Sequence, residues 1–210
     1  QIQKCEYFNC KKNTELFPHF SWQAFRYFEI KGNAEVLNCE VIYSNIKQNA
    51  IFECDNSLLN WLYNTYIRTQ TNNMHCAVPS DCPHRERLGY TGDGQLTCES
   101  AMLNFSAEKF YSKWMLDIAD SQDKLTGHIQ HTAPFYGGGG GPGGWGIAIV
   151  IVPYNYYKIY GDVTVLKKYF PNMLRWLNSM QLFKKGGLIV KELDGGWCLG
   201  EWCTPEDVKI

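Results

Sequence analysis

Ionisable side chains are concentrated in one stretch of the chain, residues 78–93. Proton transfer and the recognition of polar ligands use such groups, and loops carried by a rigid scaffold often present them. The alternative is a solvated loop of ion pairs in which Asp93 only caps the following helix, and charge content alone favours that alternative. The sixteen residues contain three carboxylates, two guanidinium groups and one tyrosine ring, namely Asp81, Glu86, Asp93, Arg85, Arg87 and Tyr90.

Helical periodicity dominates the chain on both sides of this stretch. Asn56 and Ser57 are candidate caps of the first helix, and Pro153 and Pro171 predict an interruption or bend in the last two. Paired helices with long loops on alternate connections resemble a helical toroid more than a compact bundle. The expected helices cover residues 56–70, 93–103, 107–122, 145–160 and 163–183.

The first 55 residues have a different pattern, with aromatic and partly alternating side chains. Residues 20–30 and 36–43 are strand candidates, separated by a turn at residues 31–33. Two strands are too few to close a sandwich, so we expect the last hairpin of a β-sandwich domain whose earlier strands lie upstream. The predicted organisation is the end of a β-sandwich and a linker over residues 1–55, then a helical domain over residues 56–210.

Composition limits the functions open to such a chain. Its 20 Lys and Arg nearly balance 21 Asp and Glu, which gives no general electrostatic reason to bind nucleic acid or an acidic membrane. The longest apolar run, residues 147–152, is far shorter than the roughly 20 residues of a membrane span. Aromatic residues make up 15% of the chain, and their faces suit the C–H faces of sugars as well as a core. We therefore expect neither nucleic acid nor membrane as a partner.

The order of residues in the stretch resembles a known signature. Residues 79–85 read Pro-Ser-Asp-Cys-Pro-His-Arg, and residues 88–93 read Leu-Gly-Tyr-Thr-Gly-Asp after the acidic Glu86. This pattern is similar to the motif of glycoside hydrolase family 78, the α-L-rhamnosidases. The resemblance continues, in the order of the family, through residues 25–32, 114–118, 145–146, 152–154, 160–162 and 173–176.

The resemblance implies a mainly α fold, a partial (α/α)6 barrel preceded by the last strands of a β-sandwich. It also implies hydrolysis of terminal α-L-rhamnosyl residues of a glycoside or polysaccharide, with inversion. Such a reaction needs a carboxylic acid that protonates the leaving oxygen and a carboxylate that activates water, and no cofactor or metal is expected. The resemblance assigns the acid to Glu86. It assigns substrate binding to Asp81, Arg85, Tyr90, Asp93, Trp145 and Trp202.

The general base of the family lies well downstream, in the second half of the barrel. Twelve helices with their loops need far more than the roughly 155 residues that follow the β segment. We therefore expect about half a barrel here, with the base and the remaining helices in the rest of a longer chain.

Two residues depart from the family pattern. Tyr90 stands where the family has Trp, an exchange that keeps an aromatic face and loses area. Ile147 stands where the family reads Asp, so an acid near the pocket becomes an apolar side chain. These departures motivate an alternative function, a catalytically silent carbohydrate-binding relative that kept the pocket.

The cysteines bear on the compartment. There are nine, an odd number spread without a small-domain framework, which favours reduced thiols over a disulfide scaffold. A cytoplasmic location is therefore preferred, with periplasmic or secreted locations left open.

Overall fold

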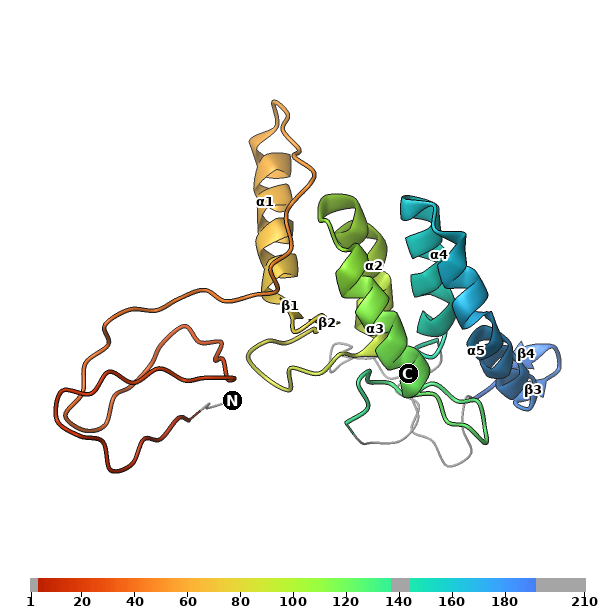
Figure 1. The fold of residues 1–210 in the computed structure, drawn as a ribbon. Coiled ribbons are helices and arrows are strands. Elements are labelled where there is room, and N and C mark those ends of the chain that lie inside the picture. Colours follow the sequence, from red (N-terminus) through yellow and green to blue (C-terminus); the bar gives the residue numbers. More distant parts are fainter. Residues whose placement is uncertain (1–3, 137–143, 192–210) are drawn as a thin grey trace, which may run out of the picture.

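The computed structural model describes residues 4–136 and 144–191, which form a mainly helical domain after an irregular N-terminal segment (Figure 1). Two short antiparallel hairpins each follow a helix. They pair β1 (Met74–His75) with β2 (Val78–Pro79), and β3 (Lys184–Lys185) with β4 (Leu188–Ile189). The helices are α1 (Ser57–Asn72), α2 (Thr91–Asn104), α3 (Glu108–Asp120), α4 (Ala148–Tyr160) and α5 (Val163–Gln181).

Local capping explains where several helices begin and end. The Asn56 side chain accepts hydrogen bonds from the N–H groups of Leu58 and Leu59, as the sequence predicted for α1. Asp162 caps α5 in the same way through the Thr164 N–H, at 2.8 Å. Gly161 ends α4 with φ of 73°, a left-handed conformation that glycine adopts without steric cost.

The two prolines lie inside continuous helices. Pro153 is in the sixth position of α4, and Pro171 is well within α5. The sequence suggested an interruption or a bend at each proline, but neither helix is interrupted. Pro153 is fully buried. Its packing in the core therefore offsets the backbone hydrogen bond that a proline cannot donate.

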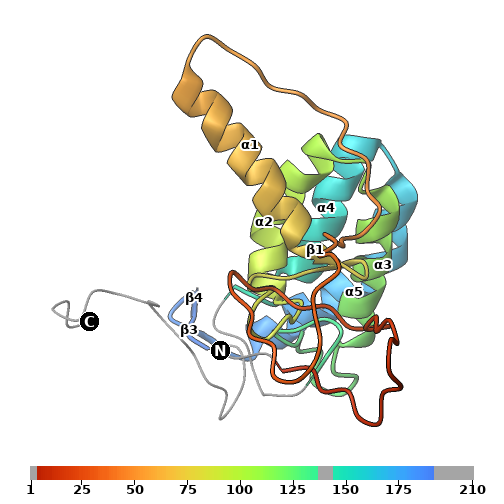
Figure 2. The same ribbon diagram turned by 90° about the vertical axis from the view of Figure 1, so that its left-hand side faces the viewer.

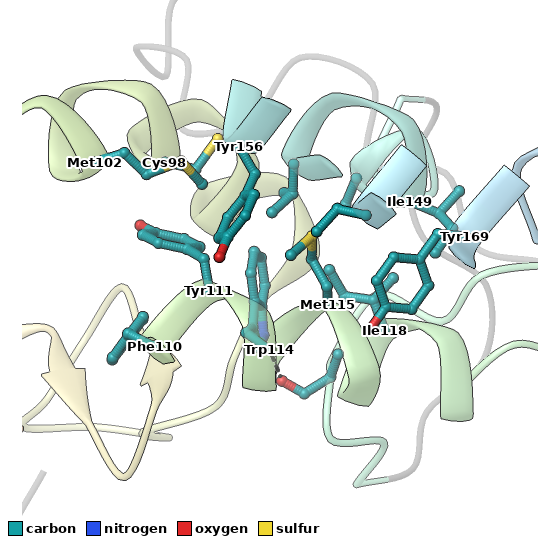
Figure 3. Packing of buried hydrophobic residues seen from close by; sticks show 14 of the residues in the cluster. Cys98, Met102, Phe110, Tyr111, Trp114, Met115, Ile118, Ile149, Tyr156 and Tyr169 are labelled. Carbon is teal, nitrogen blue, oxygen red and sulfur yellow. Dashed lines mark hydrogen bonds between the residues drawn. The ribbon is translucent and has the colours of Figure 1, made fainter. Parts of the chain in front are cut away.

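Helix α4 is the central element of the helical domain. It packs against α2, α3 and α5 (Figure 2). Helix α1 contacts β1, and its Tyr63 hydroxyl donates to the Asn104 side chain of α2 at 2.9 Å. The core between the packed helices is built around Trp114 and Tyr111 of α3, both fully buried, with edge-to-face rings 6.2 Å apart (Figure 3). The Trp114 indole N–H donates to the Ala133 carbonyl at 2.8 Å, which ties the loop before residue 136 to the core.

The strands expected over residues 20–30 and 36–43 are not formed. Within the described residues before α1, backbone pairing with the helical domain is concentrated near residues 44–50, where Gln48 bridges Phe105 and the Ser44 N–H donates to the Met74 carbonyl at 2.8 Å. Apolar side chains such as Tyr27 and Val41 are exposed. A two-stranded hairpin is marginal without an apolar face to pack on, and these side chains have no such surface.

In residues 4–136 and 144–191, no helix has both the length and the apolar character needed to cross a bilayer.

Candidate active site

The loop that carries the acidic residues is fixed at both ends by the backbone. Its first residue, Ser80, donates its N–H to the Asn73 carbonyl at 2.8 Å, next to the β1–β2 hairpin. At the other end, Ala133 donates to the Gly89 carbonyl at 2.9 Å. Only glycine fits at position 89, because a Cβ there would lie 2.3 Å from the Ala133 carbonyl oxygen. The loop is therefore anchored to the segment that is itself tied to Trp114.

The start of α2 differs from the expected one and places Tyr90 and Asp93. Thr91 donates its N–H to the His131 carbonyl at 2.8 Å, and Tyr90 bridges Thr132, so this short pairing ends where the helix begins. The sequence suggested that Asp93 is the N-cap of α2. This prediction is wrong, because Asp93 lies in the first turn of the helix. The N-cap position belongs to Tyr90, which makes no capping hydrogen bond with its side chain.

Two of the three carboxylates are brought together in the loop. Ligand atoms of Asp81, Cys82 and Glu86 lie within 4.8 Å of one another. Glu86 is exposed and accepts a hydrogen bond from the Arg85 guanidinium at 2.7 Å. Asp81 is half-buried, and its Oδ1 atom is covered without a hydrogen-bond partner. The site therefore contains an unused acceptor beside an accessible carboxyl group.

Burial and neighbouring charge act on the remaining members of the cluster. Burial raises the pKa of Asp93, and the nearby Asp81 carboxylate raises it further. Burial also raises the pKa of Tyr90, with further contributions from Glu86 and Asp81. The side chains of Asp81, Glu86, Tyr90 and Asp93 thus share one electrostatic environment.

Aromatic rings form one wall beside the carboxylates. The Tyr90 ring lies edge-to-face with Trp145, with ring centroids 5.6 Å apart. Trp145 reaches this position because residue 92 is a glycine: a Cβ there would lie 2.6 Å from the indole. Two segments that are more than fifty residues apart in sequence are thereby brought to one place. Trp202, the other predicted wall, lies outside the described residues.

His131 belongs to the same wall and was missed by the sequence analysis. Its ring stacks on Tyr90 with centroids 6.2 Å apart and meets Trp145 edge-on at 6.1 Å. Burial lowers its pKa, so the neutral imidazole is favoured. No motif marks this histidine. The sequence offered one indirect indication: the loop that contains His131 connects the helix of Trp114 with Trp145, so it has to pass the site.

Ile147 immediately precedes α4 and packs partly buried against the hydrophobic core. It occupies the N-cap position and offers no side-chain cap. An apolar residue here is therefore accommodated by core packing.

The family model for the bacterial α-L-rhamnosidase six-hairpin glycosidase domain matches residues 47–210. The chain belongs to this family. An α-L-rhamnosidase of Formosa agariphila is 32% identical over 200 residues, covering 88% of this chain and 21% of its own length. One from Streptomyces avermitilis is 32% identical over 198 residues, covering 91% and 19%. The chain thus spans about a fifth of the length of these curated relatives.

Solved structures agree with the assignment to the rhamnosidase family. The Streptomyces avermitilis α-L-rhamnosidase in complex with L-rhamnose matches 69% of this chain and 14% of its own, with 34% identity and a TM-score of 0.66. The enzyme from Dictyoglumus thermophilum matches 74% of this chain and 18% of its own, with 28% identity and a TM-score of 0.68. The predicted mainly helical, six-hairpin type of fold is thereby confirmed.

Within the rhamnosidase-family motif, Asp81, Cys82 and Glu86 are close enough together to share a metal ion. Burial, a hydrogen bond with Asp81 and nearby charge raise the pKa of the Cys82 thiol to about 11, so a metal ion would have to displace the proton of this thiol in order to bind it. Arg85 already pairs with Glu86, and no metal is assigned to the cluster.

Proposed function

We propose that the complete gene product hydrolyses terminal α-L-rhamnosyl residues of glycosides or polysaccharides, with Glu86 as the general acid. The observation that carries this proposal is the placement of Glu86, an exposed carboxyl beside the half-buried Asp81 in a chain of the rhamnosidase family. An aromatic wall of Tyr90 and Trp145 accompanies these carboxylates. Carboxylates suit the hydroxyl groups of a sugar and aromatic faces suit its C–H groups.

The short distance between Asp81 and Glu86 bears on their roles. An inverting pair of carboxyl groups is roughly 6.5–9.5 Å apart, to leave room for the attacking water, whereas a retaining pair is about 5–5.5 Å apart. One carboxylate oxygen of Asp81 and one of Glu86 lie within 4.8 Å of each other, closer than the carboxyl groups of an inverting pair. We therefore assign Asp81, together with Asp93, to sugar hydroxyl groups. The base is assigned to a carboxylate outside this sequence.

Arg85 has two partners in this proposal. In this structure the Arg85 guanidinium pairs with the Glu86 carboxyl group, the group that must donate a proton as the general acid. In the proposed complex the guanidinium moves from Glu86 to an oxygen of the substrate. This exchange accounts for both the ion pair of the free protein and the substrate-binding role of Arg85.

One observation favours a second candidate, a catalytically silent carbohydrate-binding relative. Ile147 is packed against the core at the start of α4, next to Trp145, and supplies no polar group there. A protein that kept Asp81, Tyr90 and Asp93 could still bind rhamnose without turnover.

The proposal predicts the stereochemistry of the product. The complete gene product is incubated with a nitrophenyl α-L-rhamnoside, and the first rhamnose anomer is identified by proton NMR before mutarotation; nitrophenyl α-L-arabinoside serves as the matched control. We expect the β anomer from the rhamnoside and slow turnover of the control. Release of the α anomer would contradict inversion and implicate the closely spaced Asp81–Glu86 pair, whereas rhamnose binding without any turnover would favour the silent relative.

A further inference from the structure

The N-terminal segment contacts the rest of the protein through a small part of its length. Within residues 4–43, residues 22–24 are half-buried and the others are exposed. Within them, the Oε1 atom of Gln23 is covered by protein. This short docking point lies against the β1–β2 hairpin and the loop of residues 80–90. Its Trp22 ring contacts both, through His75 of β1 and Arg87 of the loop.

Trp22 lies between two side chains from different elements. On one side its ring stacks on His75 of β1, with centroids 3.9 Å apart and planes 14° from parallel. On the other side the Arg87 guanidinium lies 5.2 Å from the indole centroid, within the range of a cation–π interaction. Arg87 also donates a hydrogen bond to the Trp22 carbonyl at 2.6 Å. We name this set of three residues the Trp22 clamp.

One end of the Trp22 clamp is fixed. The His75 Nε2 atom lies 3.0 Å from the Asn72 carbonyl at the end of α1, so this ring is held by the backbone of the helix. The next residues continue the tight β1–β2 hairpin, which pairs Met74 with Pro79. The His75 ring therefore gives Trp22 a surface of fixed position on which to stack.

The other end of the Trp22 clamp holds a strained residue. Arg87 has φ of 57°, a left-handed conformation that costs a residue with a Cβ roughly 1–2 kcal/mol. Such a conformation persists only where neighbouring structure enforces it, and the contacts of Arg87 with Trp22 supply that restraint. The residue before Arg87 in the chain is Glu86, so the direction of the chain at Arg87 sets where the Glu86 carboxyl stands.

We propose that Trp22 is a positioning residue for Glu86: by holding Arg87 against the fixed His75 ring, it keeps the acidic loop in its working conformation. The inference rests on the proposed function for its catalytic consequence. Its structural part, the restraint of the loop by Trp22, stands independently of any activity. The competing reading is that Trp22 only packs the N-terminal segment against the protein.

Limited trypsin digestion tests the structural part. Trypsin cleaves after Arg87 when the loop opens, and its rate follows the population of the open form. In the complete gene product, Trp22→Leu is expected to speed the appearance of the new N-terminus at Leu88 roughly fivefold or more, because the ring that holds the guanidinium is lost. Trp22→Phe retains an aromatic face, so its rate of cleavage at Arg87 is expected to lie between the rates of the unchanged protein and of Trp22→Leu. Tyr27→Leu, at an 83% exposed position of the same segment, serves as the control and should leave the rate unchanged.

The catalytic part is tested by comparing leaving groups. Misplacing a general acid lowers the rate of hydrolysis of an alkyl α-L-rhamnoside more than that of a nitrophenyl rhamnoside. The alkyl leaving group needs a proton, whereas the nitrophenolate can leave without one. Trp22→Leu is expected to lower kcat on the alkyl substrate by roughly tenfold, with a clearly smaller change on the nitrophenyl substrate and in KM. Trp22→Phe should recover most of this loss.

The outcomes separate the two proposals. An unchanged trypsin rate, or equal losses of kcat on both substrates, would overturn the positioning role of Trp22. If Glu86→Gln has no effect on either substrate while Trp22→Leu still speeds cleavage at Arg87, the proposed acid is wrong and the restraint of the loop stands.

Discussion

Asp93 is the residue at which the proposed binding of a sugar and the stability of the fold oppose each other. It is half-buried and shares the field of Asp81, so its ionised form is disfavoured in the folded protein, although it lies in the first turn of α2. An aspartate in this environment is explained by a task that needs a charged acceptor. A sugar hydroxyl group offers such a task, because a hydrogen bond to a carboxylate is stronger than one to a neutral amide.

Replacing Asp93 by Asn should therefore raise stability and weaken binding. The pKa of Asp93 is raised on folding, so its ionisation destabilises the fold above that pKa, and the penalty disappears as the pH falls through it. We expect Asp93→Asn to raise Tm at pH 7, with the difference shrinking towards pH 3, and to raise KM for a rhamnoside roughly tenfold. Differential scanning fluorimetry across pH and steady-state kinetics measure both. A lower Tm at pH 7 would show that the carboxylate is stabilising where it lies.

Helix α2 is the element that positions most of the site. Its first turn carries Asp93, the residue before it is Tyr90, and two of its glycines admit large rings from other elements. Trp145 lies over Gly92, and the six-membered ring of Trp114 lies over Gly94. The close approach of these rings connects the aromatic wall directly to the core.

Gly94→Ala tests this role of α2. A Cβ at Gly94 would lie 2.2 Å from Trp114, which is fully buried and fixed by its hydrogen bond to Ala133. Because the ring cannot move away, overpacking outweighs the gain in helix propensity, and we expect the free energy of unfolding to fall by about 1–2 kcal/mol. Urea denaturation of the complete gene product, followed by tryptophan fluorescence, measures it. Leu96→Ala in the same helix, at an 83% exposed position, should change it by less than about 0.5 kcal/mol.

Prediction from sequence succeeded where the signal is local. The periodicity and the Asn56 cap located α1, and the motif placed Asp81, Glu86 and Tyr90 in one loop. It failed where distant segments decide the structure. The start of α2 depends on the pairing of Tyr90 with Thr132, and His131 joins the site only through that pairing. The strands over residues 20–30 and 36–43 require a sheet to pair with, which local alternation does not supply.

At the scale of the whole molecule, the exposed apolar surface is the dominant feature. Leu58, Trp61 and Leu62 of α1 are exposed, and α1 stands to one side of α2, α3 and α4 (Figure 1). The chain also spans about a fifth of the length of its curated relatives. We propose that activity belongs to a larger assembly of helices, so function is to be tested on the complete gene product.

The most direct test of the central claim is the rate at which the complete gene product releases L-rhamnose from an alkyl α-L-rhamnoside, compared between the unchanged protein and Glu86→Gln. Glu99→Gln, which alters a carboxylate paired with Lys158 at 2.7 Å, is the matched control. Removal of a general acid is expected to lower kcat roughly 10²–10⁴-fold, with rhamnose binding retained and the control unchanged. Equal rates for Glu86→Gln and the unchanged protein would contradict the assignment of Glu86 as the acid of this site.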